Sequence, residues 1–86
     1  MNSKIIEGIS YIKSSKNRIK IVITLNTELK IPSEISSETK IRLNHVSKLL
    51  SELKEKNIVE CLHENDKKGR LYHLTDYGLE LYDYIK

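Results

Sequence analysis

The chain has 86 residues and a formal net charge of +3, and 38% of its residues are hydrophobic. This length supports one domain with a small core, and the mildly basic charge permits a nucleic-acid partner without requiring one. No apolar run is long enough to cross a membrane, and a single Cys with three scattered His does not have the spacing of a zinc site.

Several functional classes are disfavoured by what the sequence lacks. It has no Gly-rich phosphate loop, nucleophile motif or internal repeat, so we expect neither an enzyme nor a cofactor. The N-terminus has no signal-peptide core, and Cys61 has no second Cys to pair with, which together predict a cytoplasmic location. Cys61 alternates with Val59 in an apolar segment, and we expect it to be a buried, inert thiol.

Two apolar patterns with helical spacing open the chain. Isoleucines spread over residues 5–12 predict a helix that extends to about Lys13, with Ser3 as its N-cap. Ser14 and Ser15 interrupt this pattern and offer a cap for a second helix that ends near Asn26. The second segment is rich in β-branched residues, so a strand is the alternative, but its apolar residues fit the 3.6-residue period.

The next segment has the order of a helix-turn-helix. Residues 26–30 predict a loop, with one or two residues of strand at Lys30–Ile31. Pro32 suits the first turn of a short helix, where its missing N–H costs nothing. Residues 39–42 predict the turn, and a longer amphipathic helix follows over residues 44–56. A short helix, a tight turn and a longer helix form this motif.

The rest of the chain is organised around the helix over residues 44–56. Asn44 is its predicted N-cap, and Asn57 follows its end, where a left-handed residue is common. The opposite face bears hydrogen-bond donors, and residues 39–51 contain three basic residues and no acid. One apolar stripe runs along the helix: Val46, Leu49, Leu50 and Leu53.

After Asn57 the pattern changes to that of a β-hairpin. Residues 58–62 and 71–74 are rich in strand formers, and the polar segment between them contains Gly69, which can adopt a positive φ. Thr75 is the predicted cap of a last helix, with Asp76 in its first turn.

This order of elements, with four local sequences, resembles the small archaeal winged helix-turn-helix transcriptional regulators that are grouped loosely with the ArsR and MarR families. The matching sequences are SSKNRIKI, PSEIS, LNHVSKLLSELKEKNIVE and KKGRLYHLTDYG, which cover most of residues 14–78. Two positions depart from the family pattern, because Ile31 replaces a Ser or Thr cap and Asn57 replaces a Gly. The ArsR metal-binding cysteines are missing, so the resemblance implies no metal sensing.

The resemblance implies a mainly α fold with a small β-hairpin wing (α+β) that binds double-stranded DNA. The helix over residues 44–56 would lie in the major groove, and the wing over residues 62–71 on the adjacent groove or backbone. The alternative from another class is a winged-helix module that binds a protein of the transcription machinery. The predicted DNA contacts are Lys16, Arg18, Lys40, Arg42, Asn44, His45, Ser47, Lys48, Ser51, Lys67, Lys68, Gly69 and Arg70.

We expect residues 1–86 to form one domain that dimerises through both ends of the chain. The helix-turn-helix and the hairpin can close one small core, which leaves apolar residues of the 1–13 and 75–86 segments to be covered by a two-fold partner. The alternative is that the first helix folds back over its own domain and completes the core. Neither a membrane nor a metal is expected as a partner.

Overall fold

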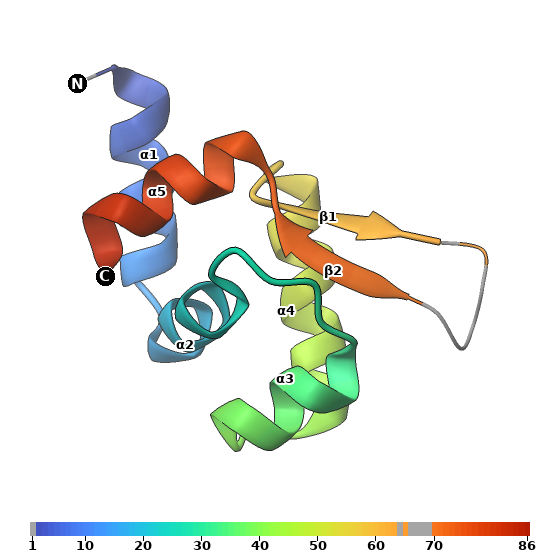
Figure 1. Cartoon of the computed structure of the whole chain (residues 1–86). Coiled ribbons are helices and arrows are strands. Elements are labelled where there is room, and N and C mark those ends of the chain that lie inside the picture. The colour runs from blue at the N-terminus through green and yellow to red at the C-terminus, as the bar shows by residue number, and fades with distance from the viewer. Residues whose placement is uncertain (1, 64, 66–69) are drawn as a thin grey trace.

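The computed structural model describes residues 2–63, 65 and 70–86. Helices and strands follow one another in the order α1, α2, α3, α4, β1, β2, α5 (Figure 1). In Figure 1 α1 and α5 lie side by side at the end that carries both termini, and α3 lies at the opposite end with the start of α4. From there α4 runs back toward the strands, which extend away from the helices. The bounds of the elements are α1 Ser3–Lys13, α2 Lys16–Leu25, α3 Pro32–Thr39, α4 Leu43–Glu55, β1 Val59–Leu62, β2 Leu71–Leu74 and α5 Asp76–Ile85.

The first two helices form where the apolar spacing predicts them, and the strand alternative for the second is wrong. The predicted cap of α1 is also wrong by one residue, because the side chain of Asn2 accepts the Ile5 N–H at 2.9 Å. Ser3 is instead the first residue of the helix. The prediction for α2 is confirmed, since the Ser15 side chain accepts the Arg18 N–H.

The helix-turn-helix begins with α3, which is longer at its C-terminal end than the sequence suggests. Pro32 occupies its first turn as predicted. The N-cap residue, Ile31, has no side-chain oxygen that could accept a backbone N–H of the first turn. Its own backbone N–H donates to Glu34 Oε1 at 3.0 Å. The helix ends with Lys40 in the left-handed conformation at φ 65°. This residue turns the chain and places Ile41 in the core.

The N-cap predicted for α4 is wrong. The helix begins at Leu43 with Arg42 as its cap, and no side chain caps it. Asn44 therefore lies in the first turn, where its Oδ1 accepts the N–H of the next residue, His45, at 2.9 Å. The cap lies two residues earlier than propensity suggests, because the chain turns at the left-handed Lys40 and, after the buried Ile41, enters helical geometry at once.

The C-terminal end of α4 is a Schellman motif, as the position of Asn57 suggests. Asn57 has φ 62°, its N–H donates to the Lys54 carbonyl at 3.0 Å, and the Ile58 N–H donates to the Leu53 carbonyl at 2.9 Å. Leu53 and Ile58 are both buried, which supplies the apolar contact of this motif. The chain therefore leaves α4 in a fixed direction toward β1.

The hairpin pairs β1 with β2 in an antiparallel register that places Val59 opposite Leu74 and Leu62 opposite Leu71. The residue of strand predicted near Lys30 is also present. Lys30 and Tyr72 exchange two backbone hydrogen bonds of 3.0 and 2.8 Å. The loop between α2 and α3 is thus attached to the second strand of the wing.

The start of α5 is attached to the end of α4. Thr75 caps α5 as predicted, because its Oγ1 accepts the Gly78 N–H at 2.9 Å. Its own hydroxyl and N–H are also engaged by the carbonyls of Asn57 and Ile58. A Cβ at Gly78 would collide with the Ile58 carbonyl oxygen, so only glycine permits this approach.

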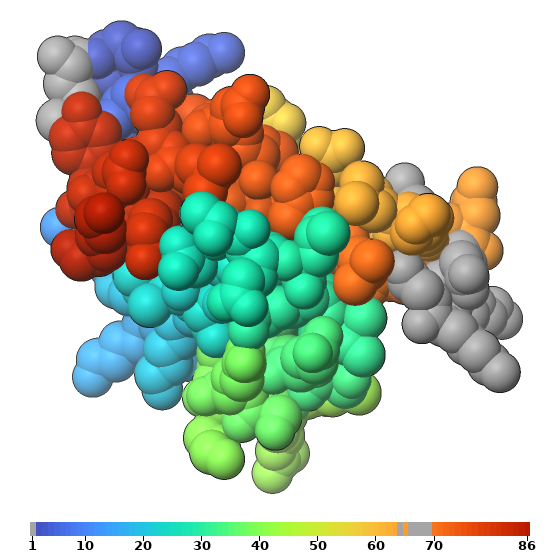
Figure 2. All heavy atoms as spheres, in the orientation of Figure 1, coloured from blue at the N-terminus to red at the C-terminus, as the bar shows by residue number. Residues whose placement is uncertain are grey.

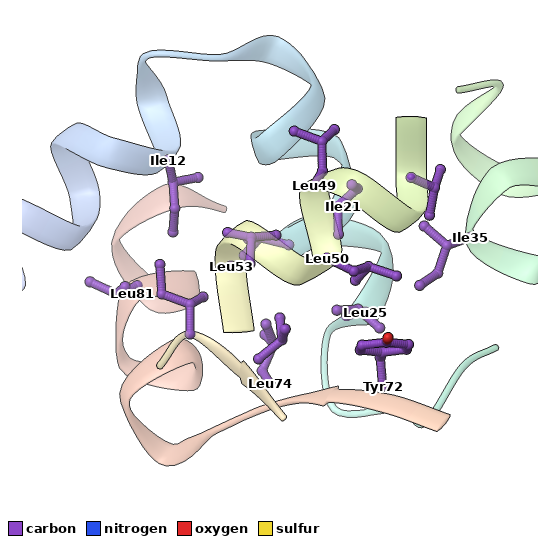
Figure 3. Packing of buried hydrophobic residues seen from close by; sticks show 14 of the residues in the cluster. Ile12, Ile21, Leu25, Ile35, Leu49, Leu50, Leu53, Tyr72, Leu74 and Leu81 are labelled. Atoms are coloured by element: carbon purple, nitrogen blue, oxygen red, sulfur yellow. The ribbon is translucent and has the colours of Figure 1, made fainter. Parts of the chain in front are cut away.

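A single cluster of buried apolar side chains joins all of these elements (Figure 3). In Figure 3, Ile12 of α1 and Leu81 of α5 lie beside Leu53 of α4. Ile5 and Ile12 are buried within the chain. The expectation that the apolar face of α1 is left uncovered is therefore wrong for its inner residues. Cys61 is only partly buried and packs against the cluster.

Candidate nucleic-acid interface

The outer face of α4 is a continuous polar surface. The residues of the apolar stripe are buried in the core, as predicted: Val46, Leu49, Leu50 and Leu53. At roughly 100° per residue, Asn44, Lys48 and Ser51 lie opposite this stripe, with Ser47 on one flank and His45 on the other. All five residues are exposed.

The side chains on this face are available to a ligand. Those of His45, Ser47, Lys48 and Ser51 form no hydrogen bond or ion pair with any other described residue, and Asn44 uses only its Oδ1, which leaves its amide N–H groups free. The face therefore presents hydroxyl, amide and ammonium donors in its first two turns. Such donors can pair with the acceptors that bases expose in the major groove.

Two further cations lie in the turn that precedes this helix. Lys40 and Arg42 are exposed, and neither pairs with an acid in the described part of the chain. In the space-filling view, the green residues of the α3–α4 turn form the lower end of the molecule (Figure 2). We call Lys40, Arg42 and the five exposed residues of α4 the tip. It is the largest group of predicted contacts that the structure brings together.

Arg18 is separated from the tip and is engaged within the chain. Its Nη1 donates to the Tyr11 carbonyl at 2.9 Å and to Ser14 Oγ at 2.8 Å, and its guanidinium carbon lies 3.9 Å from the centroid of the Tyr11 ring. Lys56, just after α4, lies over the same ring at 5.3 Å. Arg18 is thus at the C-terminal end of α4, where it fastens the α1–α2 corner. Lys16, in the first turn of α2, is exposed.

Only part of the predicted wing contacts can be placed. Arg70 is exposed and directly precedes β2. Lys67, Lys68 and Gly69 lie outside the described residues. Two residues after Arg70, Tyr72 forms the bridge to Lys30, which attaches the wing to the loop before α3.

A charged network between α2 and α3 was not predicted from the sequence. Lys30 Nζ lies 2.8 and 2.7 Å from the two carboxylate oxygens of Glu38, and Thr24 Oγ1 donates to the same carboxylate at 3.1 Å. The hydrogen bond from Lys30 lowers the pKa of Glu38 below its usual value, and the same bond raises the pKa of Lys30. This network joins α2, α3 and the loop that pairs with β2. Its hydrogen-bonded pairs are 8 and 14 positions apart, too far for a local pattern to reveal them.

Among residues 2–63, 65 and 70–86, no group of three His, Cys, Asp or Glu side chains is arranged to hold a metal ion. Within the same ranges, no helix is both long and apolar enough to span a bilayer. One groove of about 350 Å³ lies between α1, the α4–β1 turn and α5, and another of about 370 Å³ lies between α2 and α3.

Comparison with known proteins finds similarity in structure only. No family model and no curated protein sequence matches the chain. A solved structure of a double mutant of ZitR from Lactococcus lactis superimposes with a TM-score of 0.72 at 21% identity, over 81% of this chain and 49% of that chain. An apo form of the same mutant covers 93% of this chain and 60% of its own.

A second protein gives the same result. NadR in complex with 4-hydroxyphenylacetate superimposes with a TM-score of 0.73 at 18% identity, over 94% of this chain and 62% of that chain. ZitR and NadR are winged-helix transcription regulators of the MarR and ArsR type. The fold is a winged helix.

The fold predicted from the sequence is therefore confirmed, with α3 and α4 as the helix-turn-helix and β1–β2 as the wing. Nothing in these likenesses points to an archaeal source. The chain spans between 49% and 62% of the length of these winged-helix structures, so their ligands and assemblies do not transfer to it directly.

Proposed function

We propose that this winged helix binds double-stranded DNA in a sequence-specific manner and acts as a transcriptional regulator in the cytoplasm. The observation that carries the proposal is the tip, where seven exposed basic and polar residues gather without an acid at the end of a helix-turn-helix. In this geometry the first turns of α4 contact base edges in the major groove, and Lys40 and Arg42 neutralise backbone phosphates.

The wing extends this contact surface. We place residues 62–71 on the adjacent groove or backbone, with Arg70 as the described residue that contacts phosphate. The Lys30–Tyr72 bridge supports this arrangement because it fixes the wing relative to α3. Phosphate contacts of this kind raise affinity for all sequences, whereas base contacts from α4 choose among them.

We also propose that the regulator is a homodimer joined through α1 and α5. Ile5 and Ile12 are buried within the chain, but Ile6 on α1 and Tyr84 on α5 are 51% and 50% exposed. These two helices lie side by side, so their exposed apolar residues offer one surface to a second copy. A two-fold dimer would place two copies of α4 about 34 Å apart, one turn of DNA, and would favour a near-palindromic site.

Selection of bound sequences from a random DNA pool tests the function directly. We expect one enriched motif, and we expect binding to that motif, followed by fluorescence anisotropy, to weaken steeply as salt rises. Recovery of no motif, together with no salt-dependent retention on heparin, would contradict DNA binding.

The alternative, a protein-interaction module, is favoured by one observation. The groove between α2 and α3 is lined partly by Ile19 and by Ile23, which is 38% exposed. Such a groove suits an apolar side chain of a partner protein. The same selection experiment separates the two functions, because an interaction module would enrich no DNA sequence, whereas Ile23→Asp would leave DNA binding by a regulator intact.

A further inference from the structure

Leu43 is a large apolar side chain exposed at the polar tip. It is the first residue of α4 and is 50% exposed, although the apolar stripe of the same helix is buried. Exposed apolar surface of this size gains free energy when a partner covers it. The chain itself leaves this half of Leu43 in solvent.

The surroundings of Leu43 are those of a DNA-reading surface. Arg42 and Asn44, its neighbours in the chain, are exposed, and so is Ser47 one turn further along α4. Each of these side chains has hydrogen-bond donors, and no acid is found between residues 39 and 51. The other large exposed hydrophobic residues in the described ranges lie outside this segment: Ile6, Ile23, Leu29 and Tyr84.

DNA offers one apolar group that matches such a side chain. In the major groove, thymine presents its C5-methyl group beside the O4 acceptor, and apolar contact with this methyl distinguishes thymine from the other bases. The N-terminal residues of a recognition helix are those that reach base edges. On the basis of the proposed function, we infer that Leu43 contacts the C5-methyl group of a thymine and sets the base preference at that position.

Replacing thymine by uracil tests this contact without changing base pairing. Uracil keeps the O4 acceptor and lacks only the methyl group, so each thymine of the selected motif is replaced in turn and affinity is measured by anisotropy. We expect one position in each bound site at which uracil lowers the affinity of the unmodified protein about fourfold, the size that burial of one methyl group produces.

Three variants assign the effect to Leu43. Leu43→Ala should weaken binding to the thymine site by about the same factor and bind the thymine and uracil sites equally. Leu43→Met, which keeps an apolar contact, should still prefer thymine. Leu29→Ala is the matched control, because Leu29 is also 50% exposed but lies outside the tip, and it should keep the full preference.

The outcomes separate this inference from the function on which it rests. A selected motif that contains no thymine, or one in which no thymine-to-uracil change lowers affinity, overturns the role of Leu43 and leaves DNA binding standing. A preference for thymine that persists in Leu43→Ala overturns it as well. The measurement on the unmodified protein does not depend on whether the variants fold. Absence of any enriched motif overturns both proposals.

Discussion

The two ends of α4 differ in what surrounds their cationic side chains. At the C-terminal end, the Arg18 guanidinium and the Lys56 ammonium lie over the ring of Tyr11, and Arg18 also donates to backbone and hydroxyl oxygens. At the N-terminal end, Lys40 and Arg42 are exposed without an acidic partner among the described residues. A basic residue therefore indicates a ligand only where the fold leaves its charge without a partner.

Apolar side chains show the opposite distribution. The α1–α5 end buries Ile5 and Ile12, although Ile6 stays exposed. The two helices approach closely here, since a Cβ at Gly8 would lie 2.5 Å from Tyr77 Oη and 2.6 Å from a Leu81 methyl carbon. The Tyr77 hydroxyl donates to the Lys4 carbonyl at 2.6 Å across the same contact. Substitutions at this end should therefore alter folding or assembly, and substitutions at the tip should alter binding.

The largest expected effect is on the free energy of unfolding, and it should differ between the inner and the outer face of α1. Ile12→Ala should lower the free energy of unfolding by roughly 2–5 kcal/mol, because it opens a cavity at a fully buried site. Ile6→Ala, at a position that is 51% exposed, should change it by less than about 0.5 kcal/mol. Chemical denaturation measures both.

The exposed position, Ile6, also tests the proposed dimer. Ile6→Asp should weaken self-association in sedimentation experiments without unfolding the chain. A clean monomer of 10.0 kDa for the unmodified protein at low micromolar concentration would contradict the proposed dimer.

The next effect contrasts cations at the two ends of α4. Joint replacement of Lys40 and Arg42 by Gln should reduce the slope of log affinity against log salt by about 1.8 per chain, at about 0.9 per phosphate contact. Arg18→Gln should lower thermal stability and leave the slope unchanged, because its charge serves the α1–α2 corner. A reduced slope for Arg18→Gln would mean that this corner also contacts DNA.

A smaller effect separates base reading from phosphate contact. His45→Ala or Ser47→Ala should change the preferred base at one position, at a cost of roughly 1–3 kcal/mol for a lost contact. Arg70→Ala should instead weaken binding to all sequences and reduce the salt slope by about one unit. Uniform weakening by all three variants would show that α4 positions the protein without reading bases.

The smallest effect concerns the network that holds the tip to the rest of the chain. The pKa of Glu38 is lowered in the folded state by its hydrogen bond from Lys30. The stabilisation is therefore fully present above the ordinary carboxyl pKa and is lost as pH falls below it toward the folded-state pKa. Thermal unfolding of Glu38→Gln should lack this acid dependence. An identical acid dependence in the variant would remove Glu38 as its source.

The sequence predicts the elements of this fold well because each has a clear period or a strong punctuating residue. The apolar stripe from Val46 to Leu53 is buried as its spacing predicts. Pro32 occupies the first turn of α3, and Thr75 caps α5, both as predicted. The cap of α1 is displaced by one residue from prediction and the cap of α4 by two. A cap depends on where the preceding chain turns, and before α4 the chain turns at the left-handed Lys40.

The candidate site is less predictable because exposure is a property of the assembled chain. Lys48 and Arg18 have the same formal charge, and the contact between Arg18 and Tyr11 spans a helix corner that no periodicity encodes. Burial of Ile12 likewise depends on how closely Gly8 admits α5. The sequence does not predict the exposure of Leu43, because an apolar residue at the start of a helix suggests burial in the core.

The hydrogen bonds between Thr75 and Ile58 attach α5 to one end of α4, and the tip lies at the other end. The tip lies about 13 residues from this junction, which is roughly 20 Å along the helix at about 1.5 Å per residue. A rotation of the helix-turn-helix about the junction by about 5° moves the tip by roughly 1.7 Å, more than the few tenths of an ångström that a hydrogen bond tolerates. A displacement of α5 that rotated the helix-turn-helix about this junction would therefore be larger at the tip than at the junction itself.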